Sequence, residues 1–290
     1  MITSFLVQIM EKKKTKKDLS FYMGNVSIIF VTLMVSFFPL YVSDRYYYIR
    51  HDKLYAFYVL ASLLVIVMGS VLLTHYNKRD KNNTVENKGK VLSFTDYGMI
   101  GFLISAVIST LVSDYKFDSL TGALGRNNGL ILTFAYFVVY FIISRTYREN
   151  KVVPIVMAVV SSFVAFIGIL QQFYWDPLNL YNGMSSSQYT KFISTIGNRN
   201  IFSAYLTIVM PLCMVLFILS KKYYQKIIYG ISAVITFGGI VCCNSDGSIL
   251  GTLGLFVFCY IFFIRNLKDF SNLLIITSLM LIGCKVIRYF

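Results

Sequence analysis

Long apolar runs separated by short polar segments fill most of this 290-residue chain. Runs of this length can cross the hydrocarbon core of a bilayer. Each is predicted to be a helix, because only helices and closed barrels satisfy the backbone in lipid, and the alternating pattern of barrel strands is missing. The sequence therefore predicts an all-α polytopic membrane protein of about nine spans, at 22–42, 54–74, 97–113, 129–144, 152–174, 200–220, 227–243, 248–264 and 271–288.

Composition agrees with this class, since 57% of residues are hydrophobic and only 14% are charged. Soluble domains seldom reach that apolar share. The net charge of +14 would suggest a nucleic-acid partner in a soluble protein. Here the positive-inside rule accounts for most of it, so no nucleic-acid partner is expected.

Lysine and arginine alternate between rich and poor loops. The loops near 12–17, 78–90, 145–151, 221–226 and 265–268 carry about twice as many as the intervening ones, which predicts a cytoplasmic N-terminus. Residues 1–21 are then a basic cytoplasmic segment drawn to anionic membrane lipids, and 22–290 form a single transmembrane domain. The first apolar run has no clear cleavage site and is interpreted as a retained anchor. Tyrosines and a tryptophan at the outer boundaries predict an aromatic belt of Tyr46, Tyr47, Tyr48, Tyr174 and Trp175.

The sequence contains no motif typical of metal binding or redox chemistry. All five cysteines lie inside or at the ends of apolar runs, where cysteine acts as a small hydrophobic residue. Their spacing matches no zinc or redox motif, so no metal and no cofactor are expected. Nucleotide-binding loops and hydrolase triads are also missing.

The most distinctive stretch, at 194–211, reads S-T-I-G-N-R-N-I-F-S-A-Y-L-T-I-V-M-P and joins a polar head to an apolar run. Charge at a membrane face is costly and needs a reason. One interpretation is a helix start, with Asn200 as N-cap, Gly197 as turn residue and Arg199 reaching to the headgroups. The other is a ligand site including Asn198, since helix N-termini attract anions.

Three further polar segments are predicted on the outer face. Between 122 and 129, glycines permit a tight turn that places Arg126 and Asn128 at the mouth of the fourth span. Gln172 ends the fifth span, where an amide can also simply bond between helices. Ser245 and Asp246 open the eighth span, where a plain helix cap explains them equally well.

The 194–211 stretch resembles the signature of the bacterial O-antigen ligase and polymerase superfamily, often S-T-x-G-N-x-N-x-x-(A/G/S)-x-Y-L followed by proline. The 122–130 segment resembles the family's G-x-x-x-R-x-x-G-L stretch, and family members often carry glutamine near 171–172. At 245–247 this chain has S-D-G where members commonly show S-R-G, so an acidic residue replaces the arginine. The resemblance extends over residues 20–264.

The resemblance implies an enzyme of the bacterial cytoplasmic membrane that works without metal or nucleotide sugar. At the outer face it would move saccharide from an undecaprenyl-diphosphate carrier, the lipid-linked donor, to an acceptor glycan or lipid. Guanidinium groups bind phosphate oxygens in pairs and stay charged, so Arg126 and Arg199 are predicted to hold the diphosphate. Asn198, Asn200 and Asn128 would orient the diphosphate or the first sugar. A second set of candidates comprises Ser245, Asp246 and Gln172.

The general base stays unassigned. Family enzymes carry functional arginine and histidine on a large outer loop further along, and this chain ends at Phe290 about where that loop would begin. A truncated or inactive copy, or one completed by another polypeptide, is therefore expected. Two other classes stay open: a transporter or flippase-like protein, with polar residues near midplane, and a non-catalytic scaffold for envelope assembly, which the missing arginine favours.

Overall fold

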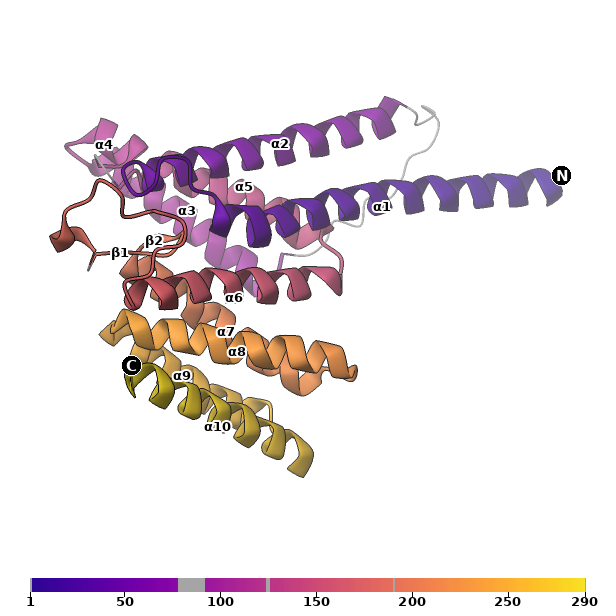
Figure 1. Cartoon of the computed structure of the whole chain (residues 1–290). Helices are drawn as coiled ribbons and strands as arrows, with labels where there is room; N and C mark the ends of the chain where they lie inside the picture. Colours follow the sequence, from indigo (N-terminus) through magenta and orange to yellow (C-terminus); the bar gives the residue numbers. More distant parts are fainter. Residues whose placement is uncertain (1, 78–91, 124–125, 190, 290) are drawn as a thin grey trace. The chain divides into compact units, whose positions relative to one another are not determined.

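The computed structural model of the chain describes residues 2–77, 92–123, 126–189 and 191–289 (Figure 1). These residues are helical apart from loops and one minimal hairpin. The elements are α1 (Ile2–Leu40), α2 (Ile49–Asn77), α3 (Phe94–Val112), α4 (Lys116–Thr121), α5 (Leu130–Thr146), α6 (Val152–Gln172), η1 (Ser186–Gln188), β1 (Phe192–Ile193), β2 (Gly197–Asn198), α7 (Arg199–Leu219), α8 (Tyr223–Cys243), α9 (Asp246–Phe262) and α10 (Leu267–Tyr289).

The all-α prediction is confirmed, and each predicted span overlaps a helix. Within the described residues, seven helices are long and apolar enough to cross a membrane: Leu19–Leu40, Ile49–Tyr76, Phe94–Val112, Val152–Gln172, Arg199–Leu219, Tyr223–Cys243 and Leu267–Ile287. The apolar helices α5 and α9 have 17 residues each. That length gives about 26 Å at 1.5 Å per residue, short of a hydrocarbon core of about 30 Å. Nine spans, a cytoplasmic N-terminus and a single transmembrane domain therefore stay predictions.

The helices fall into two compact units. The first contains residues 1–31 and 54–150, and the second contains 32–53 and 151–290. In the first unit, α5 packs against α3 and α4. Asp96 and Ser93 form a capping box at the start of α3, and the Asp96 carboxylate pairs with the Arg145 guanidinium of α5 at 3.3 Å.

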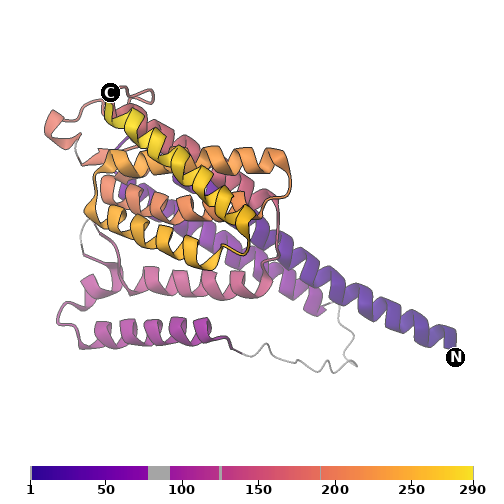
Figure 2. The same ribbon diagram turned by 90° about the horizontal axis from the view of Figure 1, so that it is seen from below.

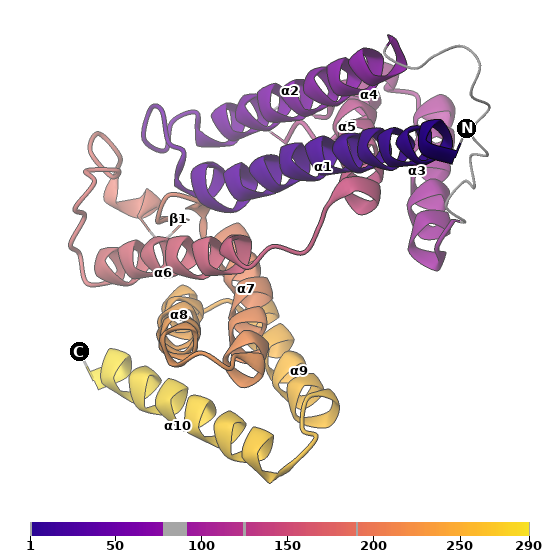
Figure 3. The ribbon, with the colours of Figure 1, turned by 90° about the vertical axis from the view of Figure 1, so that its right-hand side faces the viewer.

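The second unit is built around α8, which packs against α6, α7 and α10, while α9 packs against α7 (Figure 3). Figure 2 shows α10, in yellow, crossing this group of helices. The helices approach closely because some positions carry no side chain. A Cβ on Gly239 would lie 2.7 Å from Leu206 Cδ1, and one on Gly168 would lie 2.6 Å from Phe202 Cζ. Both neighbours, Leu206 and Phe202, are fully buried.

The end of α1 also belongs to the second unit. Its last carbonyls, which no helical N–H can reach, accept hydrogen bonds from elsewhere: Lys53 Nζ donates to Phe38 O at 2.9 Å, and Thr195 Oγ1 donates to Pro39 O at 2.8 Å. The Lys53 bond holds the start of α2 against the end of α1, and the Thr195 bond holds the loop before α7 there.

Candidate functional site

The start of α7 is fixed by a cap and a left-handed turn. Asn198 Oδ1 accepts hydrogen bonds from the backbone N–H of Asn200 at 2.9 Å and of Ile201 at 3.3 Å, which makes Asn198 the N-cap. The prediction of Asn200 as N-cap is therefore wrong by two residues, and Asn200 lies exposed in the first turn. Gly197 has φ +95, so its predicted role as a turn residue is confirmed.

Arg199 turns inward across the ends of two other helices and does not extend toward the surroundings. Its Nη2 donates to Gln172 Oε1 at the end of α6, at 3.0 Å, and its Nη1 lies 3.5 Å from the Cys242 carbonyl at the end of α8. The residue is half-buried. The structure thus brings together two of the predicted site residues, Arg199 and Gln172.

The charge of Arg199 has no acidic partner in the described part of the chain, because no carboxylate oxygen lies within 4 Å of its nitrogens. A guanidinium offers five N–H donors. Two of them face neutral acceptors, and Nε is buried without any hydrogen-bond partner. The C-terminal carbonyls of α8 attract the charge only as a partial dipole. Arg199 therefore retains capacity to bind an anion.

A two-stranded hairpin precedes α7 and carries its first residues. Phe192 pairs with Asn198 and Ile193 with Gly197 in antiparallel register. At the tight connection, Ser194 has φ +55 and is fully buried. The Ser194 hydroxyl donates to Val164 O of α6 at 2.6 Å, so the hairpin is fastened to the helix that also provides Gln172.

Tyr46 anchors this hairpin from the loop between α1 and α2. It is 3% exposed, and its hydroxyl donates to Ser194 O at 2.8 Å and to Gln171 Oε1 at 3.3 Å. Burial raises its pKa well above the ordinary value of 10.0, with a smaller increase from nearby Tyr181. The assignment of Tyr46 to an aromatic belt is therefore wrong, because the side chain is part of the packed interior.

A second set of bonds links the loop at 173–191 to α6 through Asp176 and to the hairpin through Tyr181. Its two carboxylate oxygens accept from Gln171 Nε2 at 2.9 Å and from the Tyr181 N–H at 2.8 Å. The Tyr181 hydroxyl donates to Phe192 O at 2.7 Å. Burial raises the Tyr181 pKa to about 12, and the positive charge of Arg199 opposes this rise. Sequence patterns offered one signal for Asp176, since Asp before Pro marks a turn.

The predicted tight turn at the mouth of α5 is confirmed. The N–H groups of Arg126 and Asn127 both bond to Ala123 O, at 2.9 and 3.1 Å, and Gly122 has φ +93. A Cβ on Gly129 would lie 2.2 Å from Leu120 O, so that position requires glycine. Gly125 of the predicted motif lies outside the described residues.

Arg126 and Asn128 are exposed, and the Arg126 side chain makes no hydrogen bond or ion pair with the residues that the structure describes. Both residues belong to the first unit, whereas Arg199, Asn198 and Asn200 belong to the second. The predicted joint action of the two guanidiniums on one diphosphate stays a prediction.

The turn between α8 and α9 holds the remaining candidates. Ser245 occupies the N-cap position of α9, but its side chain makes no capping bond; its carbonyl accepts from Ser248 Oγ at 2.8 Å. Asp246 is exposed in the first turn and lies beyond ion-pair distance of Arg199. Neither Ser245 nor Asp246 forms a hydrogen bond or ion pair with the guanidinium, in contrast to Gln172. Of the glycines in α9, Gly251 lies against α7, because a Cβ there would lie 3.3 Å from Thr207 Cγ2, whereas a Cβ on Gly254 would meet nothing within 4 Å.

The cysteines are free thiols, and all but the half-exposed Cys284 are buried. Among the described residues, no group of three His, Cys, Asp or Glu side chains is arranged to hold a metal ion.

Comparisons of this chain with protein-family models, with curated proteins and with solved structures find no match.

Proposed function

We propose that this protein takes part in the transfer or polymerisation of saccharide from an undecaprenyl-diphosphate-linked donor to an acceptor glycan, and that Arg199 binds the donor's diphosphate. The proposal joins the O-antigen ligase-like pattern of residues 194–211 to one structural observation. That observation is a half-buried guanidinium with no acidic partner and a buried, unpartnered Nε, positioned beside the N-terminus of α7.

Electrostatics support this assignment. Negative charge grows on the diphosphate as the glycosidic bond breaks, and donors that are already oriented in a partly dry site stabilise such charge more than water does. The hydrogen bond from Arg199 to Gln172 and the hairpin that precedes α7 fix the guanidinium before any ligand binds. The N-terminus of α7 adds a partial positive charge.

The asparagines divide into two roles. Asn198 is committed to capping α7 through its Oδ1, so it acts by positioning the helix start. Asn200 is exposed on the first turn next to Arg199, and the proposal assigns it to the first sugar.

No general base is assigned. Asp176, the carboxylate in the loop network, already accepts two hydrogen bonds that hold the loop. The proposal therefore concerns donor binding, which can be measured without the acceptor.

The experiment measures binding of an undecaprenyl-diphosphate-linked oligosaccharide to the full chain in nanodiscs. Charge-assisted hydrogen bonds contribute about 1.5–3 kcal/mol, so Arg199→Ala is expected to weaken binding about ten- to hundredfold. Arg199→Lys keeps the charge but loses the planar fork, and should fall between wild type and alanine. Arg265→Ala, an exposed arginine between α9 and α10, is the matched control and should bind normally.

Saccharide transfer is then followed with donor and acceptor glycan together. Loss of one pre-oriented donor group is expected to reduce transfer roughly a hundredfold for Arg199→Ala, and similarly for Arg126→Ala if both groups contact the diphosphate. Near-normal donor binding by Arg199→Ala would remove the proposal. Lipid flipping in proteoliposomes without any transfer would replace it with the transporter class.

A further inference from the structure

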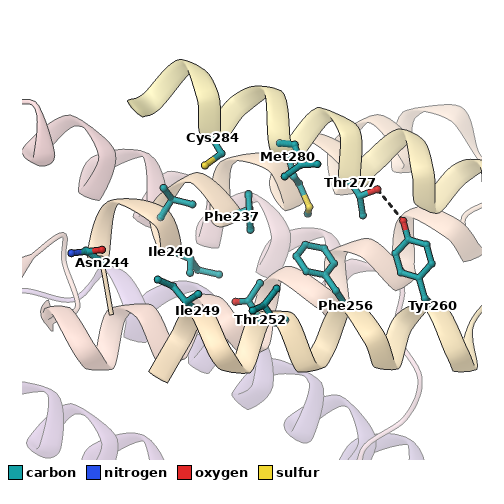
Figure 4. Close-up of a pocket in the computed structure, with 13 residues that line it drawn as sticks. Phe237, Ile240, Asn244, Ile249, Thr252, Phe256, Tyr260, Thr277, Met280 and Cys284 are labelled. Atoms are coloured by element: carbon teal, nitrogen blue, oxygen red, sulfur yellow. Dashed lines mark hydrogen bonds between the residues drawn. The ribbon is translucent and has the colours of Figure 1, made fainter. Parts of the chain in front are cut away.

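A largely apolar cavity of about 470 Å³ lies in the second unit among α8, α9 and α10 (Figure 4). Its walls include Phe237, Ile240, Leu253, Phe256, Met280 and Leu281. Figure 4 shows Tyr260 and Thr277 joined near one end, by a hydrogen bond of 3.0 Å, and Asn244 at the other. Gln172 and Cys242, whose oxygens Arg199 contacts, are not among the residues that line the cavity. Its walls suit a hydrocarbon chain.

One wall residue points to the chemistry of the occupant. Thr252 is 4% exposed, lines the cavity, and its hydroxyl has no hydrogen-bond partner. By contrast, the buried Thr236 of α8 bonds to Ser232 O of its own helix at 2.7 Å, and the half-buried Thr207 of α7 bonds to Ser203 O of its own helix at 2.8 Å. A buried hydroxyl without a partner destabilises the folded state, because it has lost its hydrogen bonds to water and gained none in return. An occupant with an acceptor oxygen at this depth would remove that cost.

A lysine on α10 lies as many residues from the Tyr260–Thr277 bond as Thr252 does on α9. The Tyr260–Thr277 bond sets the register of the two helices. Thr252 lies eight residues before Tyr260 and Lys285 lies eight residues after Thr277, so each is about 12 Å along its helix from that bond. Lys285 is exposed, follows the lining residue Cys284, and forms no hydrogen bond or ion pair with the described residues. A lysine in this position extends its ammonium group toward the headgroups.

We propose that this cavity binds one acyl chain of an anionic glycerophospholipid, with Thr252 Oγ1 donating to an ester carbonyl and the Lys285 ammonium group binding the phosphate. The cavity provides apolar walls, Thr252 an unpartnered donor within them, and Lys285 a cation beside them, which match the hydrocarbon, ester oxygen and anion of such a lipid. A polyprenyl phosphate fits less well, because its hydrocarbon joins the phosphate directly and offers Thr252 no ester carbonyl between the two. The inference is independent of the proposed function at Arg199.

The test uses phosphatidylglycerol with a photoactivatable group in its acyl chain, added to the full chain in nanodiscs of phosphatidylcholine. Labelled positions are mapped by mass spectrometry of peptides. We expect labelling at Phe256 and Met280 above the level at Val59 and Leu63, which are exposed on α2 and report general lipid contact. Unlabelled phosphatidylglycerol should compete more strongly than phosphatidylcholine of the same chains.

Two matched pairs of variants identify the contacts. Thr252→Val keeps the shape and removes the hydroxyl, and should weaken binding about fivefold, as expected for one hydrogen bond. Thr207→Val is the control, because the Thr207 hydroxyl bonds within its own helix, and it should not weaken lipid binding. We expect phosphatidylglycerol to compete roughly fivefold more strongly than phosphatidylcholine, because its anionic headgroup is attracted to one lysine. Lys285→Gln should remove most of this difference, whereas Lys221→Gln between α7 and α8 should leave it unchanged.

Unchanged labelling in Thr252→Val, equal labelling of α2 and the cavity, or stronger competition by undecaprenyl phosphate would each overturn the proposal. If Thr252→Val does not fold, Leu253→Trp provides the second variant. Leu253 lines the cavity and is 57% exposed, so a larger side chain can occupy the space without entering the core. It should abolish cavity labelling, and retained labelling would count against the site. Arg199→Ala should leave the labelling intact, which separates this result from the proposed function.

Discussion

Replacing Tyr46 with phenylalanine tests whether a buried hydroxyl holds the site in place. The substitution removes one oxygen and leaves the ring contacts intact, with centroids 5.1 Å from Phe192 and 5.4 Å from Tyr181. Ser194 O loses its 2.8 Å donor while the residue stays fully buried. Gln171 Oε1 keeps the bond from the Ser194 N–H, so the loss is concentrated at one carbonyl.

A buried acceptor that loses its donor costs about 1–3 kcal/mol. Each 1.4 kcal/mol is tenfold in an equilibrium constant, so local opening of the hairpin should increase about five- to hundredfold. The rate of amide hydrogen exchange measures this local opening directly. In Tyr46→Phe, amides of residues 193–198 should exchange faster by that factor, while amides in the centre of α8 should not change.

Tyr48→Phe is the matched control, because Tyr48 lies in the same loop, is 64% exposed, and has no hydrogen bond through its hydroxyl among the described residues. It should exchange like wild type. If Tyr46→Phe also stayed within twofold of wild type at 193–198, the hydroxyl would not hold the hairpin and the argument for a pre-oriented Arg199 would lose its support.

The pKa values give the same prediction a pH dependence. Burial raises the pKa of Tyr181 to about 12 and that of Tyr46 further, from an ordinary value of 10.0. The folded state therefore keeps these protons after the unfolded state has lost them, so stability falls as pH rises. Protection of 193–198 should be constant below about pH 10 and should decrease as pH rises from there toward 12. Constant protection through pH 12 would contradict the assigned burial.

The remaining predictions concern packing and topology. Gly239→Val should lower the thermal unfolding midpoint by roughly 5 °C, because its side chain would overlap a buried leucine of α7; Gly254→Val, where a Cβ meets nothing within 4 Å, is the control and should change little. If both lose the same stability, close packing is not the cause. In intact cells a membrane-impermeant maleimide should label Asp114→Cys, and should label Lys221→Cys only after permeabilisation; the reverse result would contradict the predicted cytoplasmic N-terminus.

Apolar run length was enough to predict the helices. A helix in lipid must satisfy its own backbone, so a local property decides the local structure. The turn at Gly197 and the presence of a helix start beside it were also recognisable, because helix starts and left-handed turns use few residue types. The N-cap is Asn198, two residues before the predicted Asn200, because the sequence alone does not reveal which asparagine has the extended backbone of an N-cap.

The residues that hold the site in place could not be predicted from local sequence patterns. In the sequence, nothing distinguishes Tyr46 from the neighbouring Tyr47 and Tyr48, which are exposed. Tyr46 is buried because its ring packs against Phe192 and its hydroxyl bonds to Ser194 O. Asp176 is committed to Gln171, five residues earlier, by loop geometry that the sequence pattern does not specify.

Sequence alone determined that this chain forms apolar helices with a charged, amide-rich start to α7, because hydropathy and capping act within a few residues. Tertiary structure decided what that charge contacts. The ends of α6 and α8, far away in the sequence, supply neutral acceptors to Arg199 and no carboxylate in the described residues. Whether a guanidinium is neutralised or left free for an anion depends on such distant neighbours, and on that point a local pattern carries no information.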